Sequence, residues 1–159
     1  GDYYCGSSPQ LYSGAVSFMQ SQSRAPSFVV HSGDVPDVWN WQEMHNGSAL
    51  YDANTFTANS LMQAFPKTPV FFALGNHDFP AAGAFGAASP MDCPFADCSA
   101  HYAAMCSAWS RDLDAAALKS CKMHGYYFVD EKVDGVRVIV MNTQFFNWEV
   151  GVDLANRTH

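Results

Sequence analysis

Two short stretches of the sequence end in polar side chains that could do chemistry. One reads VVHSGD and ends at Asp34, and the other reads FFALGNHD and ends at Asn76, His77 and Asp78. A carboxylate can bridge two cations, an amide oxygen is a neutral metal ligand, and a histidine can bind metal, donate a proton or hold a phosphate oxygen. These residues predict a site for two divalent ions, about 3.5–4 Å apart, that would lower the pKa of a shared water and clamp a phosphoryl group.

The same residues also have an ordinary structural interpretation. Gly33-Asp34 alone is a common turn, and Asn-His-Asp after a glycine is compatible with turn chemistry. A site is favoured because three polar side chains without a role in a core gather at the end of an apolar strand. Within that site, we expect Asp78 to orient His77 through a hydrogen bond.

Hydrophobic patterning indicates the elements that would hold these residues. Residues 9–24 and 48–65 predict helices, because apolar side chains recur at helical spacing. Their buried faces are expected to comprise Leu11, Ala15, Phe18 and Met19 in the first helix, and Leu50, Thr57, Leu61 and Phe65 in the second. Residues 27–34 and 68–76 predict buried strands that end at the two polar motifs.

The second half of the chain predicts short helices and a hairpin. Residues 99–121 read as one or two helices, with His101 expected at the surface. Residues 125–131 and 136–146 read as strands joined at Asp134-Gly135, the second of them buried. The order of elements predicts an α/β layered fold with a sheet flanked by helices. Ligands in such sheets lie beyond the carboxyl ends of the strands, where both polar motifs fall.

Composition limits the classes of function. The 159 residues suffice for one domain with a core, and 48% of them are hydrophobic, which argues against disorder. The formal net charge of −7 disfavours binding to a nucleic-acid polymer and suits a site that holds cations. We find no apolar run long enough for a transmembrane segment. The sequence carries no signal for an oligomeric state.

The cysteines indicate an oxidising compartment. Four of the five, Cys93, Cys98, Cys106 and Cys121, fall close together without the CxxC spacing of a zinc knuckle. Disulfides are preferred to metal binding, with Cys93–Cys98 and Cys106–Cys121 as one arrangement among several that the sequence allows. The sequons at Asn46 and Asn156 agree with a secreted, lysosomal or extracellular glycoprotein. A cytosolic protein with free thiols is the alternative.

The two polar motifs and their flanking stretches resemble those of a known family. Gly33-Asp34 followed by Gly75-Asn76-His77-Asp78 resembles the calcineurin-like metallophosphoesterases. Longer stretches, including HSGDVPDVW, PVFFALGNHD and VRVIVMNTQFF, look like acid sphingomyelinases and the acid sphingomyelinase-like phosphodiesterases. The resemblance implies that Asp34 bridges two zinc ions, that Asn76 binds the second, and that His77 contacts the phosphate or assists the leaving group.

The sequence departs from the family pattern in two respects. The family's Asp-x-His motif before Gly33 and its later histidine motifs are absent, and each supplies metal ligands. A histidine that follows the Gly-Asp-x-Pro turn in acid sphingomyelinases is also absent, because Pro36 runs directly into Asp37. We therefore expect residues 1–159 to be part of a larger catalytic domain, truncated at both ends and inactive in isolation.

Two functional hypotheses follow. The first is a metal-dependent phosphodiesterase whose substrate is a small phosphodiester or a lipid headgroup, sphingomyelin-like or nucleotide-like. The alternative is a secreted, disulfide-stapled binding domain on a phosphoesterase fold without catalysis. An ordinary α/β domain with turn-forming Asp34 and Asn76 is a third reading, in which replacing either residue would leave metal content unchanged.

Overall fold

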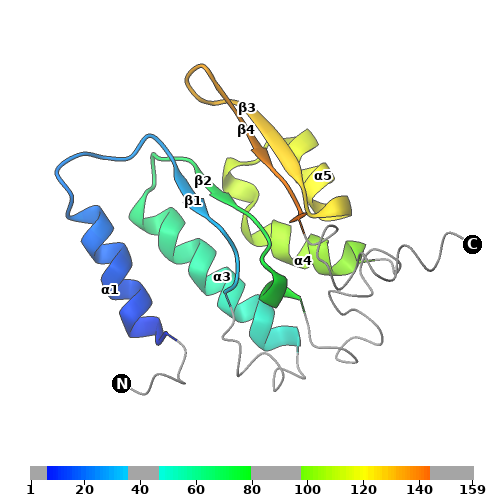
Figure 1. Cartoon of the computed structure of the whole chain (residues 1–159), viewed down its shortest axis with the longest axis horizontal. Helices are drawn as coiled ribbons and strands as arrows, with labels where there is room; N and C mark the ends of the chain where they lie inside the picture. The colour runs from blue at the N-terminus through cyan, green and yellow to red at the C-terminus, as the bar shows by residue number, and fades with distance from the viewer. Residues whose placement is uncertain (1–6, 36–46, 80–97, 144–159) are drawn as a thin grey trace, which may run out of the picture.

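The structure of the chain, a computed structural model, describes residues 7–35, 47–79 and 98–143 (Figure 1). In chain order the helices and strands are α1 (Pro9–Gln20), β1 (Val29–His31), α3 (Gly47–Ala64), β2 (Val70–Phe72), α4 (Ser99–Ala108), α5 (Ala115–His124), β3 (Tyr127–Val133) and β4 (Val136–Val140). Short 3₁₀ turns follow β2 (η1, Asn76–Asp78) and α4 (η2, Ser110–Asp112).

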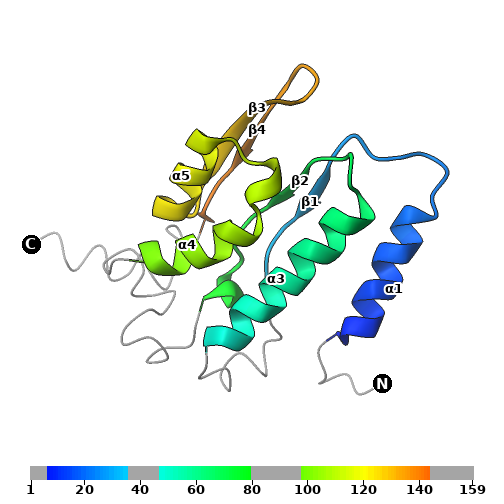
Figure 2. The same ribbon diagram turned by 180° about the vertical axis from the view of Figure 1, so that it is seen from behind.

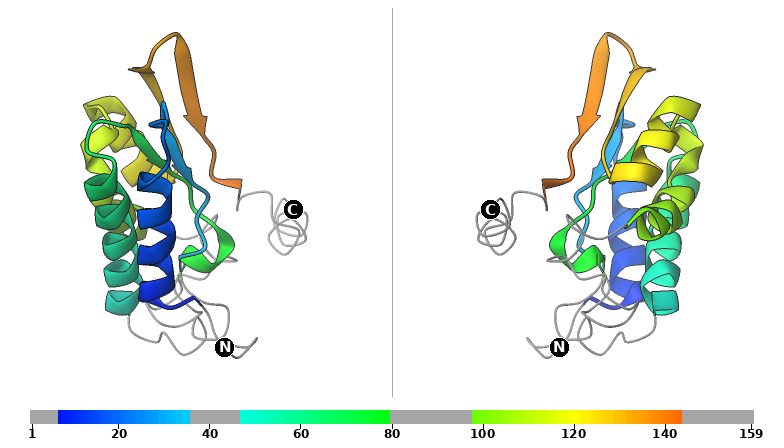
Figure 3. Two further views of the ribbon diagram at one scale, coloured as in Figure 1. Left: turned by 90° about the vertical axis from the view of Figure 1, so that its left-hand side faces the viewer. Right: turned by 90° about the vertical axis from the view of Figure 1, so that its right-hand side faces the viewer.

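The described strands form two small sheets. β1 and β2 pair in parallel, with Val29 opposite Val70, and β3 and β4 form an antiparallel hairpin. A buried tyrosine joins the sheets: the Tyr127 hydroxyl accepts a hydrogen bond from Phe72 N at 3.0 Å and donates one to Phe72 O at 2.9 Å. The described helices lie on one side of the strands (Figures 2 and 3). This arrangement confirms the α/β class, whereas the assignment of residues 1–159 to one partial catalytic domain remains a prediction.

Helix α3 has the buried face that its sequence predicts. Leu50, Thr57, Leu61 and Phe65 are each less than 8% exposed. On the same helix, Asn54 is also buried, and its amide is satisfied because its oxygen accepts a hydrogen bond from the Trp109 indole at 3.0 Å. Helix α3 packs against α1 and α4, and its buried residues belong to the same core cluster as those of β2.

Helix α1 differs from its predicted face. Leu11 and Phe18 are 64% and 67% exposed, whereas Val16 is buried and Tyr12 packs against the core. The Tyr12 hydroxyl donates to the Thr57 carbonyl of α3 at 3.3 Å. The prediction of the apolar face was wrong because α1 contacts mainly one neighbour, α3. It does so through the side that carries Tyr12 and Val16. The helix also ends earlier than predicted, at Gln20.

Two strands are less buried than predicted. Val30 in β1 is 58% exposed, and Ile139 in β4 is 66% exposed, because helices cover only one face of each sheet in the described part of the chain. By contrast, all three residues of β2 are buried. The outward side of the hairpin carries an apolar hollow of about 420 Å³, whose lining includes Phe128, Ile139 and Met141.

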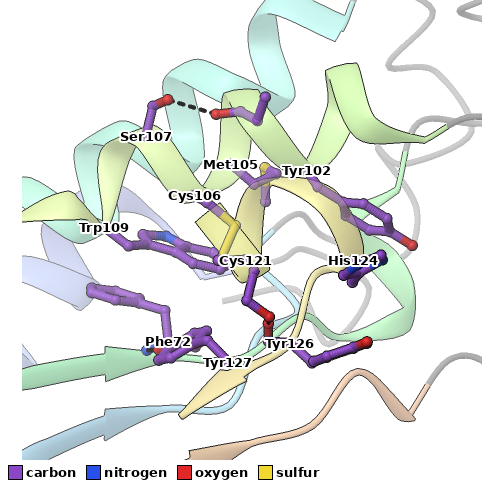
Figure 4. Close-up of a disulfide and its surroundings, with 12 residues drawn as sticks. Phe72, Tyr102, Met105, Cys106, Ser107, Trp109, Cys121, His124, Tyr126 and Tyr127 are labelled. Atoms are coloured by element: carbon purple, nitrogen blue, oxygen red, sulfur yellow. Dashed lines mark hydrogen bonds between the residues drawn. A yellow bond between two sulfur atoms is a disulfide. The ribbon is translucent and has the colours of Figure 1, made fainter. Parts of the chain in front are cut away.

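The helical hairpin α4–α5 is closed by a disulfide. Cys106 and Cys121 are bonded, which is one of the pairings that the sequence allowed, and they lie between the Phe72–Trp109 ring stack and the Tyr102 side of the core (Figure 4). Asp114 caps α5 by accepting a hydrogen bond from Ala117 N at 2.8 Å. Within the described ranges, no helix has both the length and the apolar character needed to cross a bilayer.

Candidate functional site

The two polar motifs meet at one edge of the parallel sheet. β1 and β2 run in the same direction, so the turns that follow them lie side by side. His77 N donates a hydrogen bond to the Asp34 carboxylate, Oδ1, at 2.9 Å. Residues 43 positions apart in the sequence are thereby brought into direct contact at the edge where both strands end.

The glycines in the two motifs permit this close approach. A Cβ atom on Gly75 would collide with the carboxylate and backbone nitrogen of Asp34, and one on Gly33 would collide with Gly75 N. Gly33 also has φ +89°, a conformation that side chains rarely adopt. The glycine before each polar motif is therefore required by the packing of one turn against the other.

Asp34 is exposed and adopts a left-handed conformation with φ +57°. Among the described residues it is the sole non-glycine residue with positive φ, and aspartate is one of the few side chains that tolerate this region. Its Oδ1 atom accepts the His77 N bond, whereas its Oδ2 atom makes no hydrogen bond with another described residue. Asp34 can therefore offer an oxygen to a cation at the sheet edge.

Asp78 is buried, with 1% of its surface exposed, and its carboxylate faces backbone nitrogens. Oδ2 accepts hydrogen bonds from Asp34 N at 2.8 Å and Gly75 N at 2.7 Å, and Oδ1 accepts one from Val35 N at 2.9 Å. Burial raises the pKa of Asp78, these three bonds lower it, and the Asp34 charge adds to the rise. The expected bond from Asp78 to the His77 ring remains a prediction.

Asn76 and His77 begin the 3₁₀ turn η1 beside Asp34. The Asn76 side chain is exposed and makes no hydrogen bond within the described ranges, so its amide oxygen is available to a ligand. His77 is half-buried, and its backbone is fixed by Asp34. The structure thus brings Asp34, Asn76, His77 and Asp78 together, while their roles toward metal and substrate remain proposals.

His31 belongs to the same edge of the sheet. It is the last residue of β1, and its Nδ1 atom accepts a hydrogen bond from Gly33 N at 3.1 Å. Burial lowers the pKa of His31, and the Asp34 charge partly offsets this. An aspartate three residues after a histidine on a strand end is the signal that could have indicated their proximity.

His101 is buried at 4% exposure, so its predicted surface position was wrong. Its Nδ1 atom lies 3.2 Å from the Tyr51 hydroxyl, and its ring lies 4.9 Å from that of Phe79, which follows η1. Burial lowers the pKa of His101 to about 4, and the nearby backbone of Asp78 offsets part of the shift. A helical histidine next to aromatic residues packs as a neutral ring, and it supports the end of the η1 turn.

A cavity of about 520 Å³ opens beside Asp34. Its lining includes His31, Asp34 and Asp52, together with the rings of Tyr12 and Phe56, whose centroids are 6.0 Å apart. No lysine or arginine lines it among the described residues. The cavity therefore combines carboxylates with aromatic faces next to the candidate ligand.

The donor types fit a divalent metal ion, whereas their number is small. Asp34 and Asn76 present a carboxylate and an amide oxygen, both suited to hard or borderline cations. Over residues 7–35, 47–79 and 98–143, no group of three or more His, Cys, Asp or Glu residues is placed to hold a metal. A closed site would therefore need ligands in addition to these two.

Several predicted positions lie outside the described residues. Cys98 is disulfide-bonded, but Cys93, its expected partner, is outside the described part of the chain, so that pairing remains a prediction. The candidate glycosylation sites Asn46 and Asn156 also lie outside it.

Comparison with known proteins decides the family. A model of the calcineurin-like phosphoesterase family matches residues 12–154. The chain belongs to this family. It is 31% identical over 150 residues to the Rattus norvegicus protein named cyclic GMP-AMP phosphodiesterase SMPDL3A. It is 29% identical over 151 residues to the Mus musculus acid sphingomyelinase-like phosphodiesterase 3b, and 25% over 146 to the Dictyostelium discoideum sphingomyelinase phosphodiesterase C.

These comparisons confirm the predicted calcineurin-like family and its acid sphingomyelinase-like branch as relatives. Each alignment covers 92% of this chain. The chain spans only 30–31% of the length of these relatives. The calcineurin-like phosphoesterases typically use divalent metal ions, in agreement with the donor types at the sheet edge.

Proposed function

We propose that this chain contributes to a metal-dependent phosphodiesterase site, with Asp34 and Asn76 as metal ligands. The carrying observation is the contact between the two strand-end turns, in which His77 N binds Asp34 Oδ1 at 2.9 Å. This contact fixes a carboxylate, an amide and an imidazole at one edge of the sheet. The family match and the names of the relatives support phosphodiester hydrolysis as the reaction class.

In this proposal, some residues of the chain would bind the metal ions and others would contact the substrate. When bound, two divalent ions, zinc in our proposal, supply an activated water and neutralise the charge that develops on a phosphoryl group. Asp34 would offer its Oδ2 atom, which no described residue occupies, and Asn76 its amide oxygen. His77, held at its backbone by Asp34, would contact the phosphate or donate a proton to the leaving group.

The substrate class follows from the site and from the relatives. We propose a small phosphodiester, either a nucleotide or a lipid headgroup, because relatives are named for cyclic GMP-AMP and for sphingomyelin. The cavity beside Asp34 has a volume of about 520 Å³, enough to receive one substituent of such a diester. A nucleic-acid polymer is disfavoured by the net charge of −7.

An oxidising location is part of the proposal. The Cys106–Cys121 disulfide and the disulfide-bonded Cys98 support a secreted or lysosomal protein. In such a compartment the predicted sequons at Asn46 and Asn156 would be accessible to glycosylation.

A second candidate is a binding domain that has the phosphoesterase fold but does not catalyse. It is favoured by the small number of metal ligands within residues 7–35, 47–79 and 98–143, since Asp34 and Asn76 alone cannot close a dinuclear site. The two candidates differ in whether a phosphodiester is hydrolysed. A protein that also contains the family's Asp-x-His and histidine motifs would hydrolyse it if the first candidate is right, and would not if the second is right.

Zinc binding by the chain tests the proposed ligands. At a zinc concentration high enough to load the wild type despite its small number of ligands, we expect Asp34→Ala and Asn76→Ala to lower the bound zinc measured by elemental analysis after equilibrium dialysis. Asp52→Asn is the control, because Asp52 is exposed and lines the same cavity without joining the two turns. Unchanged zinc content in Asp34→Ala would contradict the proposal.

Activity of the isolated chain gives a second test. From these 159 residues alone we expect little or no turnover of bis(p-nitrophenyl) phosphate with added zinc, because the described residues bring together too few metal ligands. Substantial turnover would show that the ligands have been assigned wrongly.

A further inference from the structure

The buried carboxylate of Asp78 is directed toward the turn that follows the other strand. Of its three hydrogen bonds, two come from Asp34 N and Val35 N, which are 44 and 43 residues earlier in the sequence. The third comes from Gly75 N, within its own turn. One side chain thus joins the backbones of both turns.

The connection is reciprocal. Asp78 accepts from the backbone of the Asp34 turn, and Asp34 accepts from the backbone of the η1 turn through His77 N. We call this pair of exchanged carboxylate–backbone contacts the aspartate clasp, formed by Asp34 and Asp78. Both halves are charge-assisted hydrogen bonds, which are stronger than bonds between neutral groups.

We propose that Asp78 is a positioning residue, which sets the orientation of Asp34 as a metal ligand. The inference rests on the proposed function, since it concerns the ligand assigned there. Asp34 adopts φ +57°, a backbone conformation that its surroundings must stabilise. Asp78 stabilises it by binding two successive N–H groups, at Asp34 itself and at the following Val35.

The loss of Asp78 would therefore change the ligand and not only the fold. Without the carboxylate, the Asp34 and Val35 N–H groups would lose their partner, and the left-handed turn would lose the contacts that hold it. The Asp34 carboxylate would then sample several orientations before it bound a cation. Replacing residues that orient metal ligands typically weakens metal binding about 10- to 100-fold.

Asp112 supplies a matched comparison. Its Oδ2 atom also accepts a backbone hydrogen bond, from Val70 N at 2.9 Å, but at the start of β2 and not at its end. Asp112 is therefore a carboxylate that ties down the same strand without touching the aspartate clasp. Its replacement removes this strand anchor together with the Arg111–Asp112 ion pair, and so it measures what is lost away from the aspartate clasp.

The experiment compares Asp78→Asn with Asp112→Asn in the whole chain. An asparagine keeps the shape of the side chain but directs an NH₂ group toward at least one backbone N–H. Zinc affinity is measured by isothermal titration, and unfolding by urea is followed for each variant. Exchange of the Asp34 and Val35 amide hydrogens is measured by NMR without metal.

We expect Asp78→Asn to weaken zinc binding about 10-fold or more and to accelerate exchange at Asp34 and Val35. Asp112→Asn is expected to leave zinc affinity within about 2-fold, even where its loss of stability is comparable. Equal zinc affinity in Asp78→Asn and the wild type would overturn the inference, as would equal weakening by the two variants.

The wild-type protein keeps the inference testable if Asp78→Asn does not fold. Amide hydrogens bound to a buried carboxylate should exchange slowly, so exchange of Asp34 and Val35 at the rate of an unprotected loop would overturn the inference. Asp34→Ala separates the two proposals. If it binds zinc like the wild type, the proposed function fails; if it loses zinc while Asp78→Asn does not, only the positioning role fails.

Discussion

The parallel pair β1–β2 and the hairpin β3–β4 are built in opposite ways. The parallel strands are three residues long, and their ends are held by hydrogen bonds between side chains and distant backbone groups. The hairpin strands are longer and adjacent in sequence, joined at Asp134-Gly135. An exposed ion pair between Arg137 and Asp130 connects them.

The difference explains where chemistry can reside. A hairpin is specified by its turn and by local pairing, and its exposed side chains tolerate change. The aspartate clasp requires two turns separated by more than forty residues to fit without a gap. At the end of the parallel pair, polar groups are therefore held by hydrogen bonds between distant parts of the chain, and our proposed site lies there.

Glycine substitutions should show the largest contrast between the two regions. Gly75→Ala would place a methyl group against Asp34, so we expect a loss of about 3 kcal/mol in the free energy of unfolding together with a loss of zinc binding. Gly135→Ala meets no atom within 4 Å, and its φ of +67° should cost only about 1 kcal/mol. Urea unfolding and zinc titration check both, and equal effects of the two would remove the contrast.

Replacing the tyrosine that joins the two sheets should have the second-largest effect on stability. Tyr127→Phe removes the hydroxyl that pairs with Phe72 N and Phe72 O, leaving two buried backbone groups unsatisfied, so we expect a loss of about 2 kcal/mol. Tyr126→Phe is the control, because Tyr126 is 44% exposed. Its effect should stay below about 0.5 kcal/mol by thermal or urea unfolding. A small loss of stability in Tyr127→Phe would mean that the two sheets are stabilised independently.

Acid should affect the region of the site through His101. Its pKa is lowered to about 4 in the folded chain and is near 6.5 when unfolded, so between these values the unfolded state binds more protons. Stability should therefore fall as pH decreases from 6.5 to 4, by up to about 3 kcal/mol from this group. Urea unfolding of wild type and His101→Leu at several pH values isolates the contribution. Parallel pH curves for the two proteins would show that His101 is not responsible.

Much of the fold could be predicted from local patterns. Leu50, Thr57, Leu61 and Phe65 were expected on one helical face, and all are buried because α3 packs against both α1 and α4. Leu11 and Phe18 were expected on a buried face of α1, and both are exposed. Periodicity shows that a helix has an apolar face, but the number of neighbours decides how much of it is covered.

That the candidate residues lie together could be predicted from the sequence, but their contacts could not. Asp34, Asn76 and His77 could be grouped because both motifs follow parallel strands. The partners of Asp78 could not, since its bonds to Asp34 N and Val35 N depend on how two turns fit in three dimensions. His101 was misplaced for a similar reason: helical spacing does not reveal that Phe79 and Tyr51 surround it.

The apolar outward side of the hairpin has a consequence for how the chain behaves in solution. Phe128, Ile139 and Met141 are each more than half exposed, so apolar side chains are in unfavourable contact with water there. At neutral pH the net charge of −7 keeps molecules apart. Near the isoelectric point of about 5.1 that repulsion vanishes, whereas the exposed apolar surface of the hairpin is unchanged. Solubility should therefore be lowest in mildly acidic buffer.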